Sequence, residues 1–224
     1  EEREDAAAAR PPRRPHARTN DPHGFFREEG TVDEPRRVFV LRTLVVFAAL
    51  SAAKQLADWG YVTSPELTEN TISGVRRFLS DWGARIDAKF VMVSLPPAFA
   101  YPEEGPTGKL IEAAVLPHCR EHGVPFALMP GVKRGVNPLL QLAGDGLAKC
   151  EIAAYERLFA SHPDNKFLVT ALSRENQHEL CVAARKFRNL HVFGCWWFTN
   201  IPSVIDEMTR MRLELVGLSV TPQH

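Results

Sequence analysis

Cysteine is scarce in this sequence, and neither sign of charge predominates. The chain has four cysteines among 224 residues, and no two of them stand in a C-x-x-C pair. A chain of this length can bury a core that needs no disulfides, so we expect reduced thiols and a cytoplasmic protein. The 27 basic residues balance the 27 acidic ones, so no net charge attracts nucleic acid or an anionic membrane.

Long apolar runs are missing as well. The longest one, Leu44–Leu50, is far shorter than the roughly 18 residues that a membrane span requires. The N-terminus lacks the apolar region of a secretory signal, and it also lacks an initiator methionine. We therefore predict no membrane and no nucleic acid among the partners, and we expect the chain to be a fragment or a processed product.

Motifs for several kinds of catalytic site are also absent. No G-x-G-x-x-G and no P-loop follows an apolar run, and no Ser/His/Asp or Cys/His arrangement can be argued from spacing. The eight histidines form no H-x-H and no H-E-x-x-H. His118 and His122 have a spacing that can place two metal ligands on one helix face, although they lie at a helix end, so the alternative is that both are structural. His178 and His191 stand alone and are expected to be structural.

A regular alternation of elements is present instead. Residues 1–18, rich in Ala, Pro and charged residues, predict a disordered tail. After them, short apolar runs alternate with segments of helical spacing. The predicted strands are Val38–Phe47, Lys89–Ser94, Val124–Met129, Lys166–Leu172, Leu190–Phe193 and Leu218–Thr221. The predicted helices cover residues 48–59, 72–82, 110–123, 146–160, 175–187 and 203–217, with a kink at Pro117, an end at Gly123, and a capping box at Ser203 and Asp206.

This alternation predicts an α/β fold with a parallel sheet covered by helices. The strands are short and uniformly apolar, as expected when both faces of a sheet are buried. Six strands, with a weaker seventh before Thr19–Pro22, fit two architectures. One is an open doubly wound sheet, whose nucleotide-binding version has no motif to support it. The other is an incomplete (β/α)8 TIM-type barrel over residues 19–224.

Functional side chains in parallel β/α folds gather just past the carboxyl ends of the strands. One loop at such a position, Pro130–Pro138, holds Lys133 and Arg134 between two glycines. An arginine there can bind a carboxylate or a phosphate through two parallel hydrogen bonds. The alternative is a solvated turn with a surface arginine.

A second loop at a strand end, Gly194–Asn200, contains Cys195, Trp196 and Trp197. An indole ring there can form the wall of a sugar site or shield a site from water. We expect one of the two rings to lie in the core and the other, Trp196, to face the site. Nothing in the sequence marks the Cys195 thiol as activated.

Five segments together carry a more specific signal. They are Thr19–Pro22, Gly131–Arg134, Ser173–Leu180, Gly194–Phe198 and Thr209–Leu215. In combination they resemble the uronate (glucuronate) isomerases of the amidohydrolase superfamily, and the resemblance is dense over about residues 76–224. It implies a (β/α)8 barrel, so we predict an incomplete barrel with about six or seven of its eight strands.

The resemblance also implies an activity and a site. Family members interconvert D-glucuronate with D-fructuronate and D-galacturonate with D-tagaturonate, which is an aldose–ketose isomerisation. The small-molecule substrate carries a carboxylate and a sugar ring, so Arg134 and Trp196 become the candidate substrate-binding residues. A divalent metal, typically zinc, is expected, bound by an H-x-H pair on the first strand and by an Asp just after the eighth.

The sequence departs from this family pattern at several points. It contains no H-x-H, and it stops at His224, before the Ser-Asp of the family. Met129 stands where other members carry a His, and Leu95 lies near a position that carries an Asp. The metal ligands are therefore absent from this chain, the catalytic residues stay unknown, and we predict impaired isomerase activity for the chain alone.

Three other hypotheses stay open. They are a non-catalytic sugar-acid-binding fragment, a different hydrolase of the amidohydrolase type, and a truncated product whose exposed barrel edges promote association. The uronate-like loop around Arg134 argues against the hydrolase. The sequence also leaves the oligomeric state open, a homo-oligomer included.

Overall fold

The structure is a computed structural model that describes residues 53–64 and 67–217. The predicted tail, the weak seventh strand, and the predicted strands at Val38–Phe47 and Leu218–Thr221 lie outside the described residues. None of the helices in the described ranges is long and apolar enough to cross a membrane.

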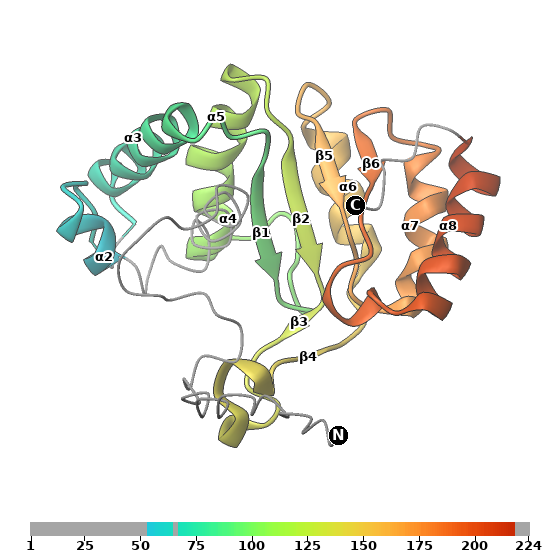
Figure 1. The fold of residues 1–224 in the computed structure, drawn as a ribbon. Coiled ribbons are helices and arrows are strands. Elements are labelled where there is room, and N and C mark those ends of the chain that lie inside the picture. The colour runs from blue at the N-terminus through green and yellow to red at the C-terminus, as the bar shows by residue number, and fades with distance from the viewer. Residues whose placement is uncertain (1–52, 65–66, 218–224) are drawn as a thin grey trace, which may run out of the picture.

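Four strands form one parallel sheet, in the order in which they occur along the chain (Figure 1). They are β1 (Val91–Leu95), β2 (Phe126–Pro130), β5 (Phe167–Val169) and β6 (Leu190–Val192). Each coincides with a predicted strand, so the four predicted strands that fall within the described residues are confirmed. A parallel sheet with strands in sequential order and helical crossovers is the arrangement found in a (β/α) barrel.

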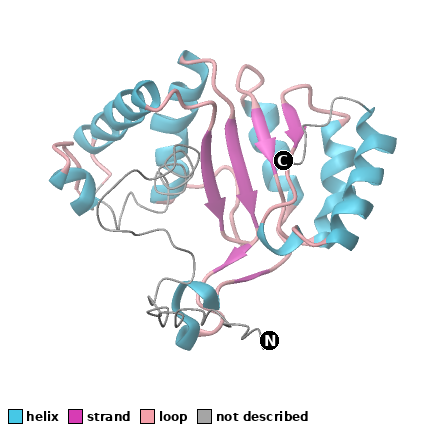
Figure 2. Ribbon diagram, in the orientation of Figure 1, coloured by secondary structure: helices cyan, strands magenta, loops and turns pink. Residues whose placement is uncertain are grey.

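Helices flank this sheet beside its two outer strands, β1 and β6 (Figure 2). On the β1 side lie α3 (Glu69–Arg85), α4 (Pro106–Leu110) and α5 (Leu116–Glu121), and on the β6 side lie α7 (Gln177–Ala184) and α8 (Pro202–Val216). The other helical segments are α2 (Ala53–Asp58), the π-helical turn η1 (Ile111–Val115), α6 (Ile152–Ser161) and the 3-10 turns η2 (Pro138–Gly144), η3 (Arg174–Asn176) and η4 (Trp197–Thr199).

The side chains of the strands divide between two faces. Val91, Val93 and Leu95 of β1 are almost fully buried in one large core, which also contains Val75 and Phe78 of α3. Burying an aliphatic side chain of this size stabilises the fold by roughly 1.5–3 kcal/mol relative to leaving it exposed. The face of the sheet that carries these residues packs against the helices, and the opposite face contacts a separate, smaller set of residues.

The helix predicted over residues 110–123 is a composite of three segments. Between α4 and α5, the N–H of Leu116 donates to the carbonyl of Ile111, five residues earlier, as in a π-helix. Pro117 lies in the first turn of α5, where its missing N–H leaves no helical hydrogen bond unmade. Gly123 has φ +66° and ends the helix as predicted.

Two predicted helix starts are wrong. The helix predicted over residues 146–160 begins only at Ile152, because Gly146–Leu147 forms a strand, β4, that pairs antiparallel with β3 (Val132–Lys133). Helix α8 begins at Pro202, with Ile201 as its N-cap and no side-chain capping bond. Ser203 therefore lies inside the first turn instead of capping it, because Pro202, with its fixed φ, already suits the first helical position.

Candidate active site

The loops predicted to carry the site all leave the same edge of the sheet. Backbone hydrogen bonds extend past the strand ends, from the N–H of Gly131 to the carbonyl of Leu95 (3.0 Å) and from the N–H of Phe193 to the carbonyl of Val169 (3.1 Å). The β3–β4 pair projects beyond this carboxyl edge (Figure 1). The loops that begin at Gly131 and Gly194 are therefore anchored to the sheet where they begin.

The inner face of the sheet, opposite the helix-side core, presents a row of small and apolar groups at this edge. The register places Ser94 beside Met129, and the N–H of Thr170 donates to the carbonyl of Leu128 (3.0 Å), which continues the row. All three side chains of this row are buried. None of them titrates near neutral pH, so this row supplies no general acid or base.

Leu95 was singled out because the resemblance implies an Asp near its position, but its side chain does not face inward. Its side chain is 1% exposed and belongs to the core between the sheet and the helices. The residue of β1 that faces inward at this height is its neighbour Ser94, because successive side chains of a strand point to opposite faces. Met129 does face inward, in a cluster of five buried residues: Met92, Ala127, Met129, Val132 and Leu172. We call this set the inner cluster.

Gly131 makes the turn between β2 and the β3–β4 pair. Its φ is +99°, and a Cβ atom added to it would lie 2.7 Å from the carbonyl oxygen of Ala148. The N–H of Ala148 in turn donates to the carbonyl of Gly131 (3.0 Å). Only glycine combines this backbone conformation with so close an approach, so Gly131 determines where the two cations that follow it are placed.

Arg134 lies on the exposed turn after β3, and its guanidinium is ion-paired with Asp145. Asp145 is nearly buried, and its second oxygen accepts a hydrogen bond from the N–H of Gly135 (2.9 Å). The pair holds the β3–β4 turn closed, which is a structural role. No motif in the sequence indicates Asp145, which stands between Gly144 and Gly146.

The two tryptophans of the Gly194–Asn200 loop differ in environment. Trp196 is partly buried and packs against the inner cluster. Trp197 is 38% exposed and stacks on Phe198 with ring centroids 4.8 Å apart. The expectation that the second tryptophan lies in the core is therefore wrong for Trp197. Its φ is +52°, which is rare for a bulky residue.

The Ser173–Leu180 segment is mainly structural. The side-chain amide of Asn176 donates to the carbonyl of Cys150 (2.9 Å) and accepts from the N–H of the same residue (3.0 Å). The amide of Gln177 donates to the carbonyl of Ala171 (2.7 Å), and both amide side chains are buried. His178, by contrast, is exposed. The segment thus ties the start of α7 to the chain that precedes α6.

A polar hollow adjoins this segment. It has a volume of about 480 Å³, and its lining includes Lys149, Glu151, Glu175 and Glu179. The hydrogen bond that Glu175 accepts from the Ser173 hydroxyl is the main cause that lowers the pKa of that carboxyl. With three carboxylates against one ammonium, the hollow repels an anionic ligand and is a poor candidate for a sugar acid.

The four cysteines form no disulfide with one another, and all four are buried. Burial is the main cause that raises the pKa of the Cys195 thiol, although the nearby guanidinium of Arg212 acts in the opposite direction. Because the reactive species is the thiolate, a buried thiol with a raised pKa is inert. Cys195 therefore serves packing, next to Met208 of α8 (4.0 Å between the sulfurs).

Comparison with known proteins adds the decisive observation. The chain is 49% identical to a uronate isomerase from Bacillus halodurans C-125, with a TM-score of 0.76, over 81% of this chain and 43% of that one. The chain is a relative of the uronate isomerases. Two more distant structures share the fold. One is a uronate isomerase from Thermotoga maritima, with 13% identity and a TM-score of 0.61 over 74% of this chain and 43% of that one. The other is a glucuronate isomerase from Caulobacter crescentus, with 16% identity and a TM-score of 0.61 over 75% of this chain and 41% of that one. No protein-family model matches the chain, and no curated protein does.

This relationship confirms the predicted fold class. Uronate isomerases are (β/α)8 barrels of the TIM type, and the four parallel strands in sequential order correspond to part of such a barrel. The chain spans less than half the length of each of the three related structures. The inner cluster and the row of Ser94, Met129 and Thr170 then lie on the barrel interior, below the carboxyl edge where barrel enzymes place their active sites.

The metal expected for the uronate isomerases does not fit the described residues at this edge. No group of three or more His, Cys, Asp and Glu side chains that could hold a metal ion occurs within residues 53–64 and 67–217. The inward row of Ser94, Met129 and Thr170 offers two hydroxyls and a thioether, which are poor ligands for zinc compared with imidazole, thiolate or carboxylate.

Proposed function

We propose that this chain forms part of an enzyme barrel that isomerises uronic acids between their aldose and ketose forms. The reactions are D-glucuronate to D-fructuronate and D-galacturonate to D-tagaturonate. The observation that supports this most is the 49% identity to a uronate isomerase over 81% of the chain. Arg134 and Trp196, the two substrate-binding candidates, both follow strands that end at the same edge of the sheet.

Arg134 is proposed to bind the substrate carboxylate. A sugar acid needs a cation with parallel N–H donors, which arginine offers and lysine does not. The ion pair with Asp145 fixes the guanidinium before the ligand arrives, so less conformational entropy is lost on binding.

Trp196 is proposed to form a wall for the sugar ring. It is partly buried against the inner cluster, so its ring is held in place by packing. Val132, a member of the same cluster, is two residues from Arg134. The cluster thus links the element that carries the cation to the element that carries the indole.

Proton transfer between C1 and C2 of the sugar needs a base. The described inward row contains none, and the 224 residues contain no H-x-H. We therefore assign no step to a metal held by these residues, and we expect the chain alone to bind a uronate with little turnover. Such binding without turnover would correspond to the alternative function, a sugar-acid-binding fragment.

The test is to add D-glucuronate and zinc to the purified chain and to measure both heat of binding and formation of fructuronate. Binding with slow or undetectable turnover supports the proposal for this chain. Rapid turnover would refute the claim that catalytic groups are missing from it. Absence of binding by D-glucuronate and by D-galacturonate would refute the roles given to Arg134 and Trp196.

A further inference from the structure

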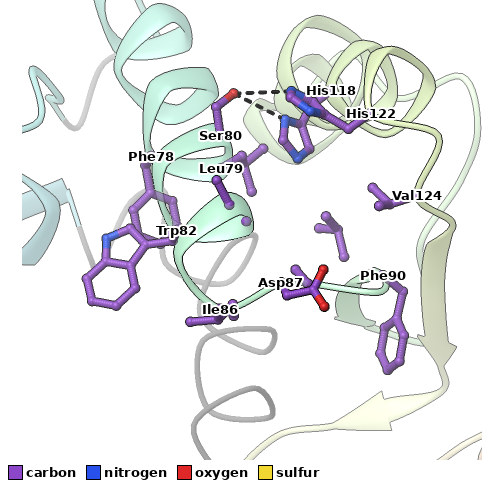
Figure 3. A pocket seen from close by; sticks show the side chains of 14 residues that line it. Phe78, Leu79, Ser80, Trp82, Ile86, Asp87, Phe90, His118, His122 and Val124 are labelled. Atoms are coloured by element: carbon purple, nitrogen blue, oxygen red, sulfur yellow. Dashed lines mark hydrogen bonds between the residues drawn. The ribbon is translucent and has the colours of Figure 1, made fainter.

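A cavity of about 250 Å³ lies at the opposite, amino-terminal edge of the sheet (Figure 3). It is bounded by α3, by α5 and by the chain that enters β1 and β2. Its walls are largely apolar, with Phe78, Trp82, Phe90 and Val124 among the lining residues. Its polar end is formed by Ser80, His118 and His122. The proposed sugar-acid site has no part in this cavity.

Two imidazoles of the cavity face a single hydroxyl oxygen. Ser80 Oγ lies 3.5 Å from Nδ1 of His118 and 3.5 Å from Nε2 of His122, and Figure 3 shows these two contacts as dashed lines. The ring centroids of the two histidines are 4.4 Å apart, and the rings are tilted by 38°. A separation of 3.5 Å is at the outer limit for a hydrogen bond, so the hydroxyl satisfies neither nitrogen strongly.

Two histidines at this spacing can share one metal ion. A tetrahedral ion binds imidazole nitrogens at about 2.0–2.1 Å, which places two such nitrogens about 3.3 Å apart. His118 and His122 are four residues apart, at the last turn of α5, so both rings leave the same side of the helix. An ion bound by one nitrogen of each ring would lie beside Ser80 of α3, whose hydroxyl both rings face.

The surroundings of the pair carry charges of both signs. His118 is 4% exposed. Close by, Glu121 pairs with Arg76 (2.7 Å).

We propose that His118 and His122 bind one divalent transition-metal ion, such as Cu²⁺ or Zn²⁺, with the Ser80 hydroxyl and water completing the coordination. Imidazole ligands favour these ions over Mg²⁺ or Ca²⁺. Two imidazoles make an open and therefore moderate-affinity site, unlike the closed four-ligand sites of structural zinc. Because Ser80 lies on α3 and both histidines belong to the end of α5, a bound ion would connect the two helices.

The test uses the metal-stripped full chain, titrated with Cu²⁺ and followed by electron paramagnetic resonance. The expected spectrum shows two imidazole nitrogens coupled to the copper. His122→Gln should weaken binding at this site at least tenfold and remove one of the two nitrogen couplings. His178→Gln, which changes an exposed and solitary histidine, is the matched control and should change neither.

A second measurement does not depend on the spectrum. An ion that binds only the folded state raises the melting temperature, so Zn²⁺ should raise it for the wild type and for His178→Gln but not for His122→Gln. Equal copper affinity in His122→Gln and in the control would overturn the proposal. A wild-type spectrum with a single coupled nitrogen, or an equal zinc effect in all three proteins, would also overturn it.

Discussion

The buried amide of Asn176 allows the sharpest stability prediction. In Asn176→Ala, the hydrogen bonds to the N–H and to the carbonyl of Cys150 disappear, together with the weaker one from the Cys150 thiol (3.6 Å). Asn176 is 4% exposed and Cys150 is also buried, so water cannot readily replace either partner. Each buried group left unsatisfied costs about 1–3 kcal/mol, so the free energy of unfolding should fall by about 2–5 kcal/mol.

Urea denaturation followed by circular dichroism measures this loss, with the free energy taken from the midpoint and slope of the transition. His178→Ala, two residues away but exposed, is the matched control and should change stability by less than about 0.5 kcal/mol. If Asn176→Ala unfolds at the same urea concentration as His178→Ala, the assignment of the Ser173–Leu180 segment to a structural role is refuted.

Two further predictions concern Gly131 and His118. Gly131→Ala should lower the free energy of unfolding by about 1–3 kcal/mol through backbone strain, and further through the clash with the Ala148 carbonyl. In Gly135→Ala the new Cβ meets nothing within 4 Å, so this variant should lose only the strain energy. Equal melting temperatures for the two variants would contradict this. Burial is the main cause that lowers the pKa of His118 to about 4 from its ordinary value of 6.5. The unfolded chain therefore binds more protons between these two pH values, so the free energy of unfolding should fall as the pH drops through this window. Urea titrations at several pH values should show a shallower fall for His118→Gln, and an equal fall in both proteins would contradict the assignment.

Much of the fold could be predicted from the sequence because its signals are local. The runs that contain β1, β2, β5 and β6 are apolar on both faces, and this feature identifies strands of a covered parallel sheet. Gly123 and Gly217 mark helix ends through their positive φ values. The direction of the parallel strands was enough to predict that the candidate site lies at their carboxyl ends.

The features that could not be predicted depend on tertiary contacts. The β3–β4 pair has two residues in each strand, too few for any periodicity to be visible. Because β4 occupies Gly146–Leu147, helix α6 begins at residue 152 and not at residue 146, where the sequence predicted it. The Arg134–Asp145 ion pair joins residues 11 positions apart across this hairpin, so no motif in the sequence indicated it.

The environments of the tryptophans illustrate the same limit. From the sequence we expected Trp196 to face the site and the neighbouring ring to lie in the core. The fold separates them differently: Trp196 packs against the inner cluster, whereas Trp197 is exposed and has a positive φ. Which of the two rings is covered therefore depends on tertiary packing.

The most direct test of the central claim is a calorimetric titration of the chain with D-glucuronate, repeated with Arg134→Met and Lys133→Met. Both variants remove one positive charge from neighbouring exposed positions, so a general electrostatic effect would weaken binding equally. We expect D-glucuronate to bind the wild type and Lys133→Met with similar affinity, and to bind Arg134→Met at least tenfold more weakly. Equal binding by both variants, or no binding by the wild type, would contradict it.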